Sequence, residues 1–247
     1  MSDSSSVSTG SDLSNLREVD VNSVQLGDGS GDWSDAVDRL DEYLNNNERP
    51  EMSARWARQQ QARLIATDRC AQEWAESTVL LTATASTTWP ESDRLIPPVA
   101  HYRRGIEATR DAREKALSRA LSGSKWRAVR VLGAGEDGYL HAHVGVYVDD
   151  MVDVDRFEPW VRAHTSNSPL STDGAHGSGT IRIESVDDDS DGVTGLEGYL
   201  LVNALGLDTT GDKTHGLESA PIHRKRAGSV LRAVGADPVR YGRTTRD

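Results

Sequence analysis

The chain has 247 residues and a formal net charge of −11 at neutral pH, with a single cysteine, Cys70. One cysteine excludes a disulfide within the chain and fits a reducing compartment, and there is neither a signal-peptide pattern nor an apolar run long enough to cross a membrane. We therefore expect a cytoplasmic protein that does not engage membranes. The negative charge is unusual for a nucleic-acid binder, which normally carries a basic surface.

The choice of charged residues predicts the salt environment. Aspartate is abundant and almost every cation is arginine. An acidic surface with little lysine suits a cytoplasm of molar salt, where charge repulsion is screened. We therefore expect the fold to need high salt and to loosen as the ionic strength drops. The lysines are Lys115, Lys125, Lys213 and Lys225.

The N-terminal part divides into a tail and two helices. Residues 1–32 are rich in Ser, Asp and Gly and poor in apolar side chains, which predicts a disordered tail. Residues 33–75 contain two helix patterns. The first is amphipathic and ends at the three asparagines 45–47, and the second covers Ser53 to Trp74. We expect these two helices to pack against the main domain, residues 76–243.

The main domain alternates strand and helix patterns. Strand segments are recognised by β-branched residues and period-two alternation, and helices by apolar residues three and four apart. A turn rich in glycine separates two of the strands, which predicts a hairpin. The predicted strands are Thr78–Ser86, Trp126–Leu132, Tyr139–Val148 and Thr180–Val186; the predicted helices are His101–Leu121, Val193–Gly206 and Gly228–Val234.

The strand Tyr139–Val148 carries the strongest functional signal. Its even-numbered residues are apolar and predict a face buried on the core. The opposite face carries His141 and His143 side by side, within reach of one divalent cation. Gly145, on the same face, leaves the sheet surface bare, so that a ligand could approach closely. The alternative is a pair of histidines making ordinary hydrogen bonds on a solvated sheet face.

Two segments near the C-terminus are further candidates. In the helix Val193–Gly206, Leu201 and Leu205 face inward, whereas Tyr199 lies on another face. Such a tyrosine alone more often packs than reacts. The run His223–Arg226 is a basic cluster in an acidic chain, either a helix-end charge cluster or a phosphate contact.

The order of these segments resembles the His-hydrophobe-His endonucleases. A threonine-bearing strand (Leu80–Thr84), then His141 and His143 on a strand, then a helical Tyr199 match the three motifs of that superfamily. The segment Gly138–Val146 is similar to the second motif of rolling-circle replication initiators of haloarchaeal plasmids and viruses. The resemblance covers about residues 54–243. It implies an α+β fold in which an antiparallel sheet of about five strands, related to RNA-recognition folds, is flanked by helices.

The resemblance also implies a chemistry. His141 and His143 would bind Mg²⁺ or Mn²⁺, and Tyr199 would attack a phosphate of single-stranded DNA at a replication origin, leaving a 5′-phosphotyrosine that is later rejoined. The partners would be that DNA and the host replication machinery. For a third metal ligand we expect Glu136, followed by Asp137 and Glu184. The residues expected to contact DNA are Arg224, Lys225 and Arg226.

Two positions depart from the family pattern. Relatives often carry a glutamate eight residues before the first histidine, where this chain has Gly133. After the tyrosine they carry a lysine or a second tyrosine, where this chain has Val202 and Asn203. A lone tyrosine implies that closing a circle needs a second subunit or a second use of the same residue. Two alternatives therefore remain, a single-tyrosine transposase and a DNA-binding regulator with a weakened site.

Overall fold

The computed structural model describes residues 33–47, 51–171, 180–186, 195–210 and 213–242. The predicted disordered tail, residues 1–32, lies outside this range. No helix among the described residues has both the length and the apolar character needed to cross a membrane.

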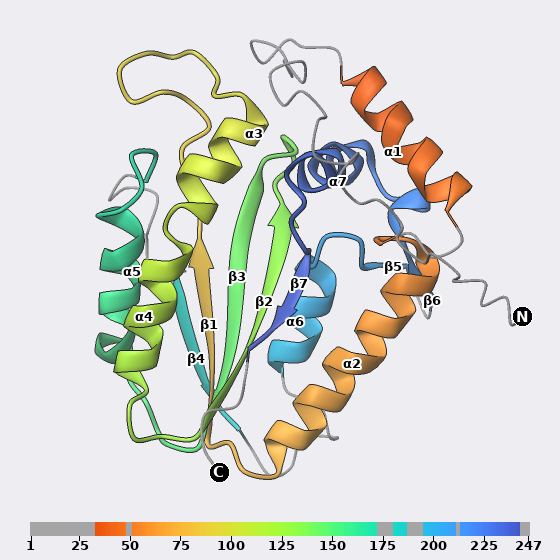
Figure 1. Cartoon of the computed structure of the whole chain (residues 1–247). Coiled ribbons are helices and arrows are strands. Elements are labelled where there is room, and N and C mark those ends of the chain that lie inside the picture. The colour runs from red at the N-terminus through yellow and green to blue at the C-terminus, as the bar shows by residue number, and fades with distance from the viewer. Residues whose placement is uncertain (1–32, 48–50, 172–179, 187–194, 211–212, 243–247) are drawn as a thin grey trace, which may run out of the picture.

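A five-stranded antiparallel sheet forms the centre of the fold, in the order β4-β1-β3-β2-β7 (Figure 1). The sequence prediction of an α+β fold with such a sheet is confirmed. The histidine strand β3 is the middle strand, paired with β1 on one side and with β2, its hairpin partner, on the other. The strands are β1 (Ser77–Ala83), β2 (Trp126–Ala134), β3 (Leu140–Val148), β4 (Ile181–Ser185) and β7 (Val239–Tyr241); β5 (Asp208–Thr210) and β6 (Lys213–His215) form a separate pair.

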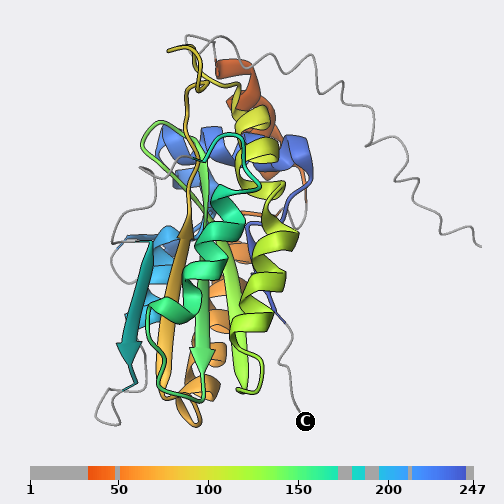
Figure 2. The ribbon, with the colours of Figure 1, turned by 90° about the vertical axis from the view of Figure 1, so that its left-hand side faces the viewer.

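Helices cover both faces of the sheet. Seen with the sheet turned by 90° (Figure 2), α4 and α5 lie side by side on one of them. Helices α2 and α6 pack together on the other face, and α1 packs on α7 at one end of the sheet. The helices are α1 (Ser34–Asn46), α2 (Ala54–Gln72), α3 (Pro98–His101), a π-helical segment (Tyr102–Glu107), α4 (Arg110–Ala120), α5 (Glu158–Thr165), α6 (Gly195–Asn203) and α7 (Ile222–Val234), with short 3-10 turns at Asp155–Phe157 and Leu217–Ser219.

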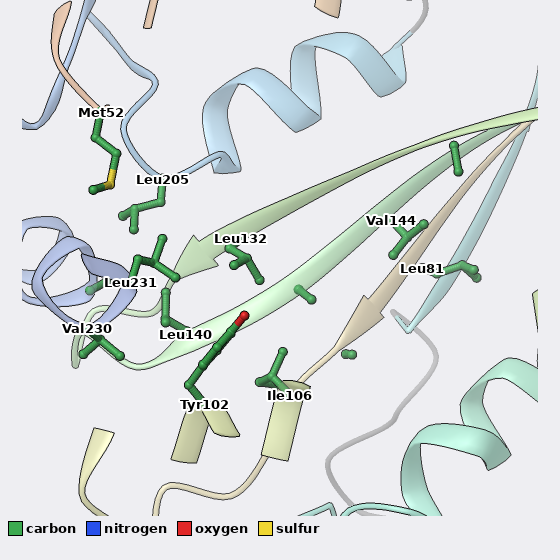
Figure 3. Close-up of a cluster of buried hydrophobic side chains, with 14 of the residues drawn as sticks. Met52, Leu81, Tyr102, Ile106, Leu132, Leu140, Val144, Leu205, Val230 and Leu231 are labelled. Atoms are coloured by element: carbon green, nitrogen blue, oxygen red, sulfur yellow. The ribbon is translucent and has the colours of Figure 1, made fainter. Parts of the chain in front are cut away.

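The larger core lies between the sheet and the helices α3, α4, α5 and α7 (Figure 3). The even-numbered residues of β3 are buried in it, as the alternation predicts. Leu140 and Leu132 meet across the β2–β3 hairpin and pack near Leu231 of α7 and Tyr102 of the π-helical segment. Because α1 also contributes Leu40, the N-terminal helix shares this core with the sheet.

The opposite face of the sheet is covered as well, which corrects one sequence inference. Gly145 was expected to leave the sheet surface bare for a ligand. In the structure a Cβ at Gly145 would lie 2.7 Å from Leu200 Cδ1 and 3.1 Å from Leu196 Cδ1. Gly145 therefore allows α6 to pack directly on β3 beside the two histidines.

The C-terminal segment also differs from the prediction. The last helix begins at Ile222 and not near Gly228, so the basic run His223–Arg226 lies in its first turns. The chain then returns as β7, in which Tyr241 pairs with Val129 of β2. Tyr241, although close to the C-terminus, is therefore held in the sheet.

Candidate functional site: two histidines beneath a helical tyrosine

The centre of the site is the histidine pair on β3. His141 and His143 point to the same face, and their rings meet edge to face with centroids 4.6 Å apart. Both positions follow from the strand alternation. Since β3 is the middle strand, hydrogen bonds on both sides hold its backbone. The two imidazole rings are therefore attached to a rigid part of the chain.

His143 is the better fixed of the two. Its side chain is 3% exposed, and its Nδ1 lies 3.1 Å from Oγ1 of Thr82, the residue directly opposite it on β1. Its Nε2 is buried and has no hydrogen-bond partner among the described residues. An unpartnered buried nitrogen is costly and rare, so this atom is open to a water molecule or a ligand. Sequence reasoning noted the alternation of Thr82 but did not assign its strand a partner, so this contact was missed.

Tyr199 lies against the same pair. Its ring meets the ring of His143 edge to face, with centroids 5.3 Å apart. It sits on α6, whose C-terminal end is attached to the sheet by a hydrogen bond from the backbone N–H of Leu205 to the carbonyl of Leu132. The structure thus brings together three of the predicted site residues, Tyr199, His141 and His143.

The other tyrosines are engaged elsewhere. The hydroxyl of Tyr147 donates to Asp68, that of Tyr139 to the carbonyl of Ile96, and that of Tyr241 to Gln60. Tyr43 accepts a hydrogen bond from a backbone N–H and Tyr102 donates to a glutamate. The hydroxyl of Tyr199 makes no hydrogen bond to any described residue, and a cavity of about 180 Å³ lies beside it, between α6 and the strands β1 and β4.

Burial of His143 and partial burial of His141 keep both imidazoles neutral. Desolvation lowers the pKa of His143 to about 3, with a smaller contribution from the neighbouring His141. Desolvation also lowers the pKa of His141 to about 4, against an opposing effect of the Asp137 carboxylate. Neutral imidazole is the form that binds a metal, so at neutral pH no proton competes for these nitrogens.

Gly133 is fitted to the ring of His141. The two residues are directly opposed in the β2–β3 pairing, so a side chain at position 133 would point to the same face as His141. A Cβ there would collide with Nε2 of His141 and would lie 2.9 Å from the carbonyl oxygen of Asn203. The imidazole and the end of α6 therefore occupy the space in which the endonuclease pattern described above would place a glutamate.

The three expected carboxylates are placed differently. Glu136 is exposed in the β2–β3 turn. Asp137, in the same turn, accepts a hydrogen bond from the backbone N–H of Tyr139, and its charge raises the pKa of His141. Glu184 is on β4 and forms an exposed ion pair with Arg182. Over the described parts of the chain, no three His, Cys, Asp or Glu side chains are grouped closely enough to hold a metal ion. The third ligand stays a prediction.

The predicted DNA-binding residues all make contacts within the protein. The Arg224 guanidinium donates to the carbonyls of Val202 and Leu207, so it holds the end of α6. Lys225 Nζ pairs with Asp41 at 2.8 Å, and Arg226 stacks over the ring of Trp33 on the N-terminal side of α1. These partners are distant in the sequence, which gave no signal for the role of Arg224. Contact of this run with DNA stays a prediction.

Comparison with known proteins gives a family match. The family described as “Putative rep protein (DUF1424)” matches residues 32–208, which include α1, α2 and all three predicted site residues brought together here. No solved structure matches the chain.

Two curated relatives come from Halobacterium. The “Uncharacterized 36 kDa protein” of Halobacterium salinarum is 39% identical over 99 residues, covering 40% of this chain and 31% of the relative. The protein of the same description from Halobacterium sp. (strain GN101) is 28% identical over 184 residues, covering 66% of this chain and 53% of the relative. The chain thus matches about a third to a half of the length of these relatives. Their source fits the salt environment inferred from the composition.

Proposed function

Because the chain belongs to the Rep family that matches residues 32–208, we propose that it initiates rolling-circle replication of a plasmid or virus by cutting one DNA strand at an origin. The observation that carries this proposal is the arrangement of Tyr199 over His143, whose buried Nε2 lacks a partner among the described residues. Tyr199, the proposed nucleophile, thus contacts the imidazole proposed to bind a metal and also lines a cavity. Membership of the endonuclease superfamily is part of this proposal.

The residues that would hold a divalent cation are His141 and His143. When Nδ1 of His143 carries the hydrogen and donates it to Thr82, the lone pair of Nε2 is left for a metal. The third ligand would come from the β2–β3 turn, from Glu136 or Asp137. Bound Mg²⁺ or Mn²⁺ would polarise a non-bridging phosphate oxygen, and imidazole ligands suit Mn²⁺ better.

Tyr199 would act as the nucleophile. Its oxygen loses a proton and bonds to the phosphorus of the scissile phosphodiester, while the bond from phosphorus to the 3′ oxygen breaks. The departing oxygen takes up a proton and becomes a 3′ hydroxyl, which the host replication machinery can extend. The 5′ phosphate stays esterified to Tyr199, so the bond energy is kept for rejoining. Attack on the ester by a 3′ hydroxyl reverses each of these changes.

A covalent-trapping assay tests the proposal. The chain is incubated with Mn²⁺ and a labelled origin oligonucleotide at molar KCl, and a protein–DNA adduct stable to SDS is expected. Tyr199→Phe should lose the adduct, and Tyr241→Phe should keep it, because Tyr241 is held at Gln60 away from the histidines. An adduct that survives in Tyr199→Phe would remove Tyr199 as nucleophile.

A second function is supported by one observation, the lack of a group of three metal-binding side chains among the described residues. A regulator on the same fold would bind origin DNA without cutting it. In that case the wild-type chain would retain the oligonucleotide in a binding assay and give no adduct at any Mn²⁺ concentration. A transposase of the single-tyrosine type would instead cut hairpins from the ends of an insertion element in preference to an origin strand.

A further inference from the structure

Helix α2 exposes a row of arginines. Arg55, Arg58, Arg63 and Arg69 are all exposed, whereas the one acidic residue of the helix, Asp68, is buried and accepts a hydrogen bond from Tyr147. At 3.6 residues per turn, the four arginines fall within an arc of about 140°, centred opposite the buried side of the helix. The sequence suggested only a packing helix here, because the apolar side of α2 explains its periodicity.

Among the described residues, the arginines of α2 form no ion pair, in contrast to at least one arginine on each of five other elements. Arginines of α4, α5, β2, β4 and β7 form ion pairs with carboxylates. No carboxylate of the described residues lies within 4.0 Å of Arg55, Arg58 or Arg69. Arg63 is stacked over the ring of Tyr241 at 3.8 Å. In a chain of net charge −11, a helix with four arginines and one buried aspartate is a local positive surface that would bind a polyanion.

The arginine row lies on the same side of the sheet as Tyr199. Helices α2 and α6 pack against each other and share one cluster of buried side chains, in which Leu64 of α2 and Leu200 of α6 take part (Figure 1). Arg69 also lies near Glu197, which is two residues before Tyr199. Burial and the charge of Asp68 raise the pKa of Glu197, and the charge of Arg69 opposes this rise. A strand bound at Tyr199 would therefore lie on the side of the sheet that carries α2.

We propose that the exposed face of α2 binds the phosphodiester backbone of the DNA that flanks the strand cut by Tyr199, an inference that rests on the proposed nicking function. From Arg55 to Arg69 the helix rises about 21 Å, which matches about six nucleotides of a duplex strand at 3.4 Å each. Arginine is suited to phosphate because its guanidinium donates two parallel hydrogen bonds to the phosphate oxygens. Because the chain as a whole carries a net charge of −11, a local row of cations would also orient the nucleic acid toward the site.

The test removes three charges from α2. The variant Arg55→Gln/Arg58→Gln/Arg69→Gln is made in the full chain with Tyr199→Phe, so that bound DNA is not cut. Arg63 is left in place because of its contact with Tyr241. Binding of labelled single-stranded and duplex oligonucleotides is measured by fluorescence anisotropy over a series of KCl concentrations at which circular dichroism shows both proteins folded.

The expected result is a shallower salt dependence. Each lost phosphate contact reduces the slope of log K against log[KCl] by about 0.9 for a duplex and about 0.7 for a single strand. The loss of three contacts would thus reduce the slope by about 2.7 for a duplex or about 2.1 for a single strand. The oligonucleotide whose slope changes is the form of DNA that lies on α2. A matched control, Lys115→Gln/Arg119→Gln, with Arg162→Gln added, removes three charges from the groove between α4 and α5 on the other side of the sheet. The control should keep the parent slope.

The inference is overturned when the α2 variant keeps the parent slope with both oligonucleotides, or when the control variant loses as much as the α2 variant does. Failure of the proposed function has a different outcome. In that case the chain carrying Tyr199 gives no adduct with origin DNA, whereas the α2 variant still binds with a reduced slope. An adduct in the chain carrying Tyr199, together with an unchanged slope in the α2 variant, would leave the nicking function in place and remove α2 as its DNA surface.

Discussion

Replacing Gly133 by alanine tests the geometry of the histidine pair most directly. A Cβ at this position would collide with Nε2 of His141, would lie 3.0 Å from its Cδ2, and would lie 2.9 Å from the carbonyl oxygen of Asn203, whereas ordinary contacts are 3.4–4 Å. The imidazole must therefore turn away, and the end of α6 must move by about half an ångström. Both movements change the position of His141 relative to Tyr199.

The expected cost follows from these contacts. Forcing an extra methyl group into a packed site costs about 1–3 kcal/mol. For a domain of this size, 1 kcal/mol lowers Tm by about 2–4 °C, so the variant should unfold about 2–12 °C below the parent. Metal–ligand distances tolerate changes of only about 0.2 Å, so we expect Mn²⁺ affinity to fall at least tenfold. For the same reason Gly133→Glu, which introduces the residue expected from the endonuclease pattern, should weaken the site and not restore it.

Thermal unfolding by circular dichroism at molar KCl and Mn²⁺ titration by calorimetry measure the two effects. The matched control is Gly198→Ala, next to Tyr199 on α6, where a Cβ meets nothing within 4 Å. It should stabilise the chain by about 0.5–1 kcal/mol, since alanine favours a helix over glycine. A Gly133→Ala variant that is as stable as the parent and binds Mn²⁺ equally well would show that His141 does not occupy the position described.

Three further predictions concern the same site. Thr82→Val removes the hydrogen bond to Nδ1 of His143 and should lower Mn²⁺ affinity about 10–100-fold, at a cost in stability of about 1 kcal/mol; an unchanged titration would contradict this. Asp137→Asn should weaken Mn²⁺ binding more than Glu136→Gln, because the charge of Asp137 acts on His141, and the reverse order would support the sequence prediction of Glu136. The free energy of unfolding of the metal-free chain should be highest above pH 6.5 and fall as the pH is lowered to about 4. In the folded chain the pKa is about 4 for His141 and about 3 for His143, whereas a free histidine titrates near 6.5. Below pH 6.5 the unfolded chain therefore binds protons that the folded chain does not, which lowers the free energy of unfolding by up to about 1.4 kcal/mol per pH unit for each histidine. Urea titrations at several pH values measure this slope, and His143→Gln should reduce it; an equal slope would exclude His143 as its source.

Local patterns in the sequence determined the elements and their faces. The alternation along Tyr139–Val148 predicted that its even positions would be buried, and the structure confirms both that core and the hairpin with β2. The same alternation placed His141 and His143 side by side, because the direction of a strand side chain depends only on whether its position is odd or even. The helix carrying Tyr199 was also predicted from its apolar spacing.

Only the tertiary structure decided what these faces meet. Thr82 and His143 are 61 residues apart, and Arg224 contacts a carbonyl 22 residues before it, so no local period encodes either contact. The basic cluster that the sequence favoured for DNA is engaged within the protein, whereas the arginines of α2 form no ion pair with a described residue. The reason is physical: periodicity reports which side of a segment is apolar, whereas pairing of charges and hydrogen bonds depends on which segments the fold brings side by side. For Gly145, the sequence determined that the position is bare, and the packing of α6 decided that a helix, and not a ligand, lies on it.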